Sequence, residues 1–286
     1  MRWTGGRRSD NVEDQRGIGV RQGAIGGGAG ILIIIAIGLL TGADPLSILG
    51  AIVGSGVSYA DVTTPSASLS AEDNQSADFV SVVLADTEDT WTAIFAKQGK
   101  VYTDPKLVLF SGGVDSACGY AETAVGPFYC PVDEKVYIDL DFYRELKDQY
   151  GAPGDFAQAY VIAHEVGHHV QNLLGTTARV EDIQARSNDV TANRYSVMLE
   201  LQADCFAGVW AKQTDNTQHF LEAGDIEEAL NAASKIGDDA LQQQAQGYVI
   251  PDSFTHGTSA QRMRWFNAGF TGGEIGSCDT FNATAL

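Results

Sequence analysis

The sequence predicts an α+β domain, rich in helices and with a small sheet, behind an apolar N-terminal segment. Three observations lead to this prediction. Helical apolar periodicity recurs from residue 77 onward, two strand-like runs flank a turn within 128–140, and residues 23–40 carry no charge. The chain beyond residue 76 is long enough for one compact domain with its own core.

The first 43 residues predict a membrane anchor. Segment 23–43 supplies roughly the 20 apolar residues that cross a bilayer as a helix. Arginines outnumber acids before it, so residues 1–22 are expected to form a basic N-terminus on the cytoplasmic side, with the remainder exported. A cleaved signal peptide is the alternative, with a poor cleavage site at 41–43.

The elements beyond the anchor follow in order. Residues 44–76 are rich in Gly, Ser, Ala and Thr and are expected to be a flexible linker, so the folded domain spans 77–286. It opens with a helix near 77–99, and a β-hairpin follows at 128–140. Further helices are expected near 155–174, 187–212, 225–237 and 258–269. Asp155 is the expected N-cap of the first of these four.

The helix expected near 155–174 contains the motif H-E-x-x-H. His164 and His168 are four residues apart, so they project from one helical face and can reach one zinc ion. Glu165 then lies beside the open side of that ion, where it can accept a proton from an attacking water. The alternative is that both histidines are ordinary, partly buried side chains. His169 lies off the ligand face and is expected to be structural.

The third ligand is expected from the helix near 187–212. Glu200 and Asp204 share one face of that helix among mostly apolar neighbours, where two carboxylates are costly unless something compensates them. We therefore expect Glu200 to bind the zinc and Asp204 to accept a hydrogen bond from a ligand histidine. The alternative is a pair of salt bridges with Arg194 or Lys212 on a solvated face.

All four cysteines follow the apolar segment, and an even count outside the cytoplasm predicts two disulfides with three possible connectivities. Cys118–Cys130 is the favoured local pair, which leaves Cys205–Cys278. No C-x-x-C spacing occurs, so a four-cysteine zinc site is disfavoured. The chain beyond residue 43 is strongly acidic, which argues against nucleic acid and anionic lipid as partners.

H-E-x-x-H followed by E-x-x-A-D resembles the active sites of the gluzincin metallopeptidases. More closely, the chain resembles the bacterial neutral zinc metallopeptidase family, through segments spread from residue 1 to beyond residue 265. These segments are Met1-Arg2-Trp3, Asn11-Val12-Glu13-Asp14, Gly126 to Pro131, the HEVGHHVQ and ELQADCFAGVWA runs, and His256 to Arg262. The resemblance implies a bacterial, zincin-like domain. Together with the apolar segment at 23–43, it gives the expected location: a single-pass protein of the bacterial cytoplasmic membrane with the peptidase domain outside.

The resemblance also implies further site residues. The hairpin strand carrying Phe128 and Tyr129 corresponds to the edge strand that binds substrate, or it is purely structural. His256 would donate to the oxyanion, and Arg262 would anchor a carboxylate of the site; the alternative is that His256 is a loop residue.

The expected activity is that of a zinc endopeptidase with one catalytic Zn²⁺. Zinc lowers the pKa of water to about 7, and Glu165 takes the proton and passes it to the leaving amine. Two alternatives remain: a non-catalytic envelope protein with a structural zinc, and a zinc hydrolase of cell-wall amides. A peptide or protein is the expected substrate, and the sequence does not specify the oligomeric state.

Overall fold

The computed structural model describes residues 1–16, 69–122 and 126–286. The expected membrane helix at 23–43 and most of the expected linker at 44–76 lie outside these residues. Among the residues that are described, no helix is both long and apolar enough to cross a bilayer. The described chain is an α+β structure with many helices and small sheets, as the sequence predicts.

A four-stranded sheet with the order β1-β2-β6-β5 organises the domain. β1 (Val12–Asp14), β2 (Lys106–Phe110) and β6 (Lys135–Asp139) are parallel, whereas β5 (Phe128–Cys130) pairs antiparallel with β6 and forms the edge. β2 and β6 are almost entirely buried, because both faces of the sheet are covered, and this explains their continuous apolar runs. The predicted hairpin at 128–140 is therefore confirmed as β5 and β6.

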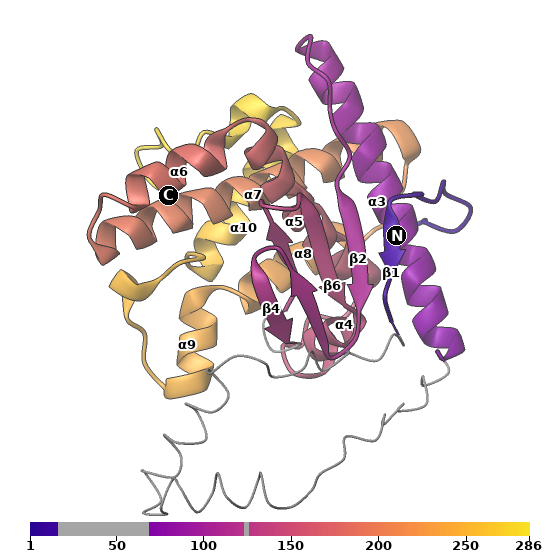
Figure 1. Cartoon of the computed structure of the whole chain (residues 1–286), viewed down its shortest axis with the longest axis horizontal. Coiled ribbons are helices and arrows are strands. Elements are labelled where there is room, and N and C mark those ends of the chain that lie inside the picture. The colour runs from indigo at the N-terminus through magenta and orange to yellow at the C-terminus, as the bar shows by residue number, and fades with distance from the viewer. Residues whose placement is uncertain (17–68, 123–125) are drawn as a thin grey trace, which may run out of the picture. The chain divides into compact units, whose positions relative to one another are not determined.

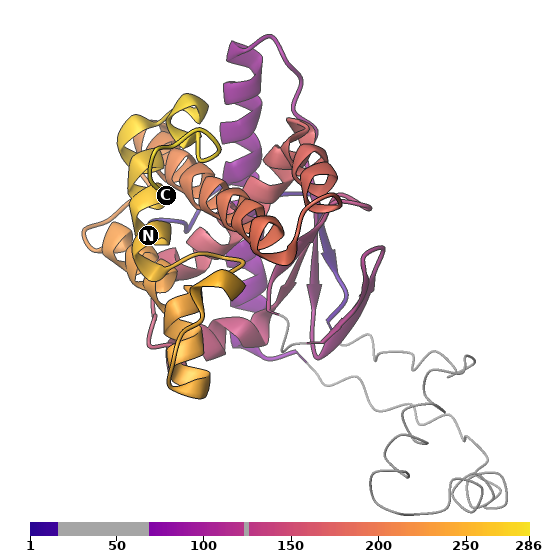
Figure 2. The same cartoon turned by 90° about the vertical axis from the view of Figure 1, so that its left-hand side faces the viewer.

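Helices cover one face of this sheet (Figures 1 and 2). The helices within the described residues are α3 (Ala71–Lys97), α4 (Leu140–Asp148), α5 (Asp155–Leu173), α6 (Thr176–Gln184), α7 (Asp189–Gln218), α8 (Asp225–Lys235), α9 (Asp238–Gln246) and α10 (Ser259–Gly272), with 3-10 turns η2 (Pro251–Ser253) and η3 (Ile275–Cys278). α5 packs directly against β5 and β6, whereas α10 packs against α7. The main apolar core lies between α3, α5, α7 and the sheet, and it includes the fully buried Trp91, Tyr160 and Phe206.

Local sequence explains where the two central helices begin and end. α5 follows Gly154, whose φ of 122° is in the region that glycine favours, so Asp155 is the first helical residue and not the expected N-cap. Gly175, in a left-handed conformation, follows its last turn. Asn188 caps α7 by accepting from the backbone N–H of Thr191.

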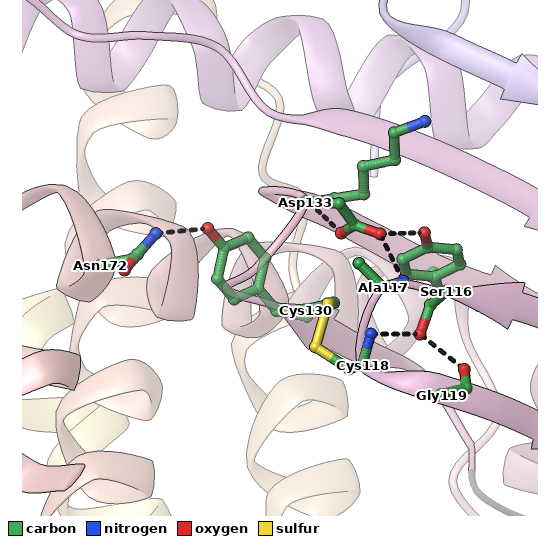
Figure 3. Close-up of a disulfide and its surroundings, with 10 residues drawn as sticks. Ser116, Ala117, Cys118, Gly119, Cys130, Asp133 and Asn172 are labelled. Carbon is green, nitrogen blue, oxygen red and sulfur yellow. Dashed lines mark hydrogen bonds between the residues drawn. A yellow bond between two sulfur atoms is a disulfide. The ribbon is translucent and has the colours of Figure 1, made fainter.

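The opposite face of the sheet is covered by a hairpin of β3 (Gly113–Ser116) and β4 (Gly119–Glu122), which forms a second apolar cluster with β2 and β6. A disulfide between Cys118 and Cys130 joins the turn of this hairpin to the end of β5 (Figure 3). The carboxylate of Asp133 adds a second link by accepting from the backbone N–H of Ala117 at 3.0 Å. The edge strand is therefore fixed covalently and by hydrogen bonds.

Residues Met1–Gln15 belong to the same compact unit as Leu69–Leu286, which differs from the expected division into a separate N-terminal segment and a domain starting at residue 77. β1 extends the sheet by pairing with β2, in the register Glu13 to Val108. Pairing between strands more than 90 residues apart has no local sequence signal, which is why the sequence analysis missed it. The domain also begins earlier than expected, at the capping box of Ser70 and Asp73 that opens α3.

The arginines near the N-terminus are bound to acidic groups of this unit. Arg7 lies 2.9 Å from Glu88 and 2.8 Å from Asp89, and Arg8 forms a bidentate contact with Asp78, all on α3. In the sequence, these two arginines contribute to the excess of positive charge that predicts a cytoplasmic N-terminus. In the structure, their charges are paired within the domain.

Candidate metal centre

Three predicted ligands come together where α5 crosses α7. The ligating atoms of His164, His168 and Glu200 lie within 4.8 Å of one another. His164 Nε2 is 3.1 Å from one carboxylate oxygen of Glu200, and His168 Nε2 is 3.4 Å from the other. All three side chains are largely buried, with exposed fractions of 8%, 15% and 18%.

These distances fit zinc. Four ligands at about 2.0–2.1 Å in a tetrahedron lie about 3.3 Å apart, close to both separations between histidine nitrogens and Glu200. Two imidazoles and one carboxylate are the donor set of a catalytic zinc site that keeps one position open. The residues present therefore fit this ion, and His164, His168 and Glu200 would hold it.

The charges of the three ligands support one another. Burial alone would lower the pKa of His164, but the charges and hydrogen bonds of Asp204 and Glu200 raise it to about 10. Burial alone would raise the pKa of Glu200, but His168 and His164 hold it well below its usual range. The three groups thus form a buried cluster of ionised partners. A metal cation can stabilise the same cluster by taking the place of the histidine protons.

Asp204 lies at the centre of a buried network behind His164. Its carboxylate accepts from His164 Nδ1 at 2.9 Å and from the hydroxyl of Tyr160. Arg262, from α10, donates to both of its oxygens at 2.8 and 2.9 Å. Because Asp204 occupies Nδ1, the Nε2 of His164 faces the metal position. Asp204 and Arg262 thus lie where the sequence analysis expected them, and the predicted salt-bridge alternative with Arg194 or Lys212 is not observed.

Two members of the histidine environment were missed by the sequence analysis. Tyr160 is one turn before His164 on the same helical face, so its spacing was a usable signal. Gln171 is three residues after His168, and its side-chain oxygen lies 2.9 Å from His168 Nδ1. Gln171 is the last residue of the HEVGHHVQ run that carries the family resemblance, but the run does not show its role, and only the position of α7 shows why it is buried.

Close approach of α5 and α7 is possible because Gly167 lies at their crossing. A Cβ added to Gly167 would be 3.1 Å from the backbone oxygen of Ala203 and 3.2 Å from its Cα. A larger residue would therefore push the two ligand-bearing helices apart. The expectation that another element packs closely against this glycine is confirmed.

The metal position opens onto a cleft of about 580 Å³. Glu165 lines this cleft, is 7% exposed and, within the described part of the chain, accepts no hydrogen bond. Burial raises the pKa of Glu165, although the neighbouring His164 and His168 act in the opposite direction. A carboxylate with a raised pKa and no fixed partner is suited to taking up and releasing a proton.

His256 also lines the cleft, and Asp238 holds it in place. Asp238 accepts from the backbone N–H groups of Thr255, His256 and Gly257, and its other oxygen lies 3.1 Å from His256 Nδ1. This hydrogen bond to Asp238 raises the pKa of His256, although burial opposes it. The structure therefore shows an anchored imidazole beside the cleft, and Asp238 is a partner that the sequence analysis did not identify.

The edge strand β5 lines the same cleft through Phe128 and Tyr129. The Tyr129 hydroxyl lies 3.0 Å from His169 Nδ1 and accepts from Asn172 at 3.1 Å. His169 Nε2 in turn donates to the backbone oxygen of Thr103 at 2.7 Å, so Nδ1 accepts from Tyr129. His169 is thus structural, as predicted, and Tyr129 ties the edge strand to α5.

The second disulfide joins Cys205 of α7 to Cys278 of η3. Together with Cys118–Cys130, it realises the connectivity that the sequence analysis favoured. It fixes the C-terminal segment to the middle of the helix that carries Glu200. Gln202, on the same helix, adds a hydrogen bond of 2.9 Å to the backbone oxygen of Cys278.

Comparison with known proteins finds one matching family and several relatives. The model of the family described as "Putative neutral zinc metallopeptidase" matches residues 1–281. "Uncharacterized protein YpfJ" of Escherichia coli (strain K12) is 52% identical over 287 residues, which cover 98% of this chain and 99% of that protein. "Uncharacterized protein Rv2575" of Mycobacterium tuberculosis (strain ATCC 25618 / H37Rv) is 48% identical over 195 residues, 65% of each chain. No solved structure matches the chain. The chain therefore belongs to the neutral zinc metallopeptidase family that this model defines, as its sequence motifs predict.

Proposed function

We propose that this protein is a zinc-dependent endopeptidase. The observation that carries the proposal is that the His164–His168–Glu200 cluster has the dimensions of a zinc site and lies beside Glu165 in one cleft. Within the residues that the structure describes, Glu165 accepts no hydrogen bond, so its carboxylate is available to a substrate water. When bound, zinc supplies Lewis acidity, which polarises a carbonyl and makes water more acidic.

The residues of the chain would then divide the remaining work. Glu165 takes the proton of the attacking water and returns it to the leaving amine, for which its raised pKa is favourable. His256, held through Nδ1 by Asp238, donates from Nε2 to the developing oxyanion. Asp204 and Arg262 keep His164 in the orientation that presents Nε2 to the metal.

Substrate would bind in extended form along β5. This strand is the edge of the four-stranded sheet, pairs on one side with β6, and borders the cleft. An added peptide strand gains main-chain hydrogen bonds from such an edge whatever its sequence. The disulfide at Cys130 and the anchored Tyr129 support a rigid strand, so binding would cost little ordering of the enzyme. The role proposed for Phe128 and Tyr129 is thus to present this backbone.

The domain is proposed to lie outside the bacterial cytoplasmic membrane, with segment 23–43 as the membrane-associated part. The two disulfides support this location, because such bonds persist in oxidising compartments. The pairing of β1 with β2 requires residues 1–15 to share that compartment. We therefore propose an N-terminus on the same side as the catalytic domain, in place of the opposite sides expected from the arginine count.

Labelling with a membrane-impermeant maleimide tests this topology in intact spheroplasts. Both Thr4 and Val101 are exposed, and all four native cysteines are in disulfides, so T4C and V101C each add one reactive thiol. Equal labelling of both variants is expected. Labelling of V101C alone, with T4C labelled only after lysis, would return the topology to a single crossing between them.

The activity is tested with the full chain in detergent, loaded with one zinc, on a library of quenched peptides. Glu165→Gln with the same measured zinc content is the matched control, since it keeps the ligands and removes the base. Cleavage by the first protein at a rate about 10²–10⁴ times that of the second is expected. Equal rates would remove Glu165 as the base. No cleavage by either, with zinc bound to both, would favour a structural zinc or a non-peptide substrate.

A further inference from the structure

We propose that Gln171 is the positioning residue that selects the metal-binding nitrogen of His168 and couples this ligand to the helix that carries Glu200. The inference rests on the proposed zinc site and adds to it a residue outside the H-E-x-x-H and E-x-x-A-D motifs. Gln171 is fully buried, and its side chain lies between α5 and α7.

The hydrogen bonds of Gln171 determine which way its amide group faces. Its Nε2 is 2.7 Å from the backbone oxygen of Leu199 and 3.2 Å from the side-chain oxygen of Gln202. A backbone carbonyl only accepts hydrogen bonds, so the atom that faces Leu199 must be the amide nitrogen. The amide oxygen of Gln171 is then the atom that faces His168, at 2.9 Å from Nδ1.

This orientation fixes the tautomer of His168. An amide oxygen only accepts, so the hydrogen atom of a neutral His168 imidazole must be on Nδ1. Its Nε2 then carries the free lone pair, and this is the nitrogen that lies 3.4 Å from Glu200. Gln171 therefore does for His168 what Asp204 does for His164, but without a charge.

Gln171 also joins two ligands mechanically. Leu199, which receives its N–H, immediately precedes Glu200 on α7, and His168 is one turn before Gln171 on α5. One amide thus fixes the distance between the second histidine and the backbone of the carboxylate ligand. Gly167 packs against Ala203 at the crossing of the same two helices, so α5 and α7 are held by one close backbone contact and by the hydrogen bonds of Gln171.

A neutral amide suits this position better than the carboxylate used behind His164. Asp204 is compensated by Arg262, whereas the groups facing Gln171 from α7 are two oxygen acceptors. A carboxylate at 171 would place its oxygens against these two acceptors, and no donor would replace the lost N–H groups. The group at 171 must be uncharged, with an acceptor facing His168 and donors facing Leu199 and Gln202, and the amide of glutamine meets these requirements.

The test combines Gln171→Met, Gln171→Glu and Gln202→Met in the full chain. Gln171→Met keeps the length of the side chain and removes both the acceptor and the donors. Gln171→Glu keeps the acceptor for His168 and removes the donors. Gln202→Met is the matched control, since it removes a partner of Gln171 but leaves the contacts with His168 and Leu199.

Two quantities are measured: zinc affinity, by competition with a chromophoric chelator, and the tautomer of His168 in the metal-free protein, by long-range ¹H–¹⁵N spectra at a pH where the ring is neutral. Gln171→Met is expected to bind zinc about 10- to 100-fold more weakly and to lose the uniform Nδ1–H tautomer. Gln202→Met is expected to change neither by more than about threefold. Gln171→Glu is expected to keep the Nδ1–H tautomer while unfolding at a lower temperature.

The outcomes separate this inference from the proposed function. Wild-type zinc affinity and tautomer in Gln171→Met would overturn the inference while leaving the zinc site intact. If Gln171→Met does not fold, the spectra of Gln171→Glu decide, and an Nε2–H tautomer there would overturn it. Failure of the wild-type chain to bind zinc would instead reject the proposed function itself.

Discussion

Replacing Asp204 by asparagine should cost stability and zinc affinity through two separable effects. Four donors converge on the Asp204 carboxylate: the Tyr160 hydroxyl, His164 Nδ1, and two nitrogens of Arg262. An asparagine at this position must point its NH₂ group at one of these donors, whichever way the amide is turned. It also leaves the guanidinium of Arg262, 3% exposed, without its ion-pair partner.

The expected loss in the free energy of unfolding is about 3–5 kcal/mol, the cost of removing one partner of a buried ion pair. This is a large share of the roughly 5–15 kcal/mol that stabilises a typical domain. Burial alone would raise the pKa of Asp204, but Arg262 and His164 lower it to about 2. Because this is below the unfolded value of 3.8, the contribution is complete above pH 3.8 and is lost as the pH falls through 2. The carboxylate itself therefore adds no pH dependence between pH 5 and 8. Against the effect of burial, Asp204 also helps to raise the pKa of His164 from 6.5 to about 10, so the difference between wild type and variant should be largest below pH 6.5 and decrease as the pH rises above it.

Urea unfolding of the zinc-free proteins measures the first effect, and chelator competition measures the second. The double variant D204N/R262M removes the stranded charge, so it should regain more than half of the lost stability. Its zinc affinity should stay about tenfold or more below that of wild type, because His164 still lacks its carboxylate acceptor. Unfolding of D204N at the same urea concentration as wild type would refute the stability argument. Recovery of zinc affinity together with stability in D204N/R262M would refute the separation of the two effects.

Three further predictions concern helix packing, a buried acid and proton release. Gly167→Val should push α5 away from Ala203 and lower the free energy of unfolding, measured with urea, by about 1–3 kcal/mol, whereas Gly167→Ala should have a much smaller effect. Equal stability of wild type and both variants would contradict the close contact. Burial raises the pKa of Asp86 to about 6, above its unfolded 3.8, so stability should fall as the pH rises through this range. At pH 8, Asp86→Asn should therefore have a free energy of unfolding up to about 3 kcal/mol higher than wild type, measured by urea unfolding. At pH 3.5 the two proteins should be equally stable. Because the pKa of His164 is raised, zinc must displace a proton when it binds, so the apparent affinity for zinc should rise between pH 6 and 8. Calorimetry in buffers of different ionisation enthalpy measures this proton release, and finding none would reject the prediction.

The sequence predicted well the parts of the site that depend on short-range periodicity. His164 and His168 share a face because they are one turn apart, and the same rule places Glu200 above Asp204. The limits of α5 followed from the glycines that flank it, and α7 begins close to the expected residue 187 but continues to Gln218, beyond the expected end at 212. Apolar surroundings of two carboxylates were sufficient to indicate that something must compensate them, and the structure supplies Arg262 and the histidines.

The parts that were missed depend on long-range contacts or on short polar elements. The parallel pairing of β1 with β2 cannot be seen in either strand alone, and Arg7 and Arg8 look identical whether they face a membrane or α3. The helices α4, α6 and α9, each of nine residues, have too few turns to give a clear period. Gln171 became recognisable only when α7 was placed beside it.

The N-terminal strand has a consequence for how the protein responds to cleavage. A proteolytic cut between residues 16 and 69 would leave Met1–Gln15 and Leu69–Leu286 on separate fragments. Their packing would then be a bimolecular association with its own dissociation constant. Release of the short fragment would expose the edge of β2, whose apolar run Leu107–Phe110 is a template for aggregation. A peptide of residues 1–15 added in trans should protect that edge, so the domain and its first strand form a natural fragment-complementation pair.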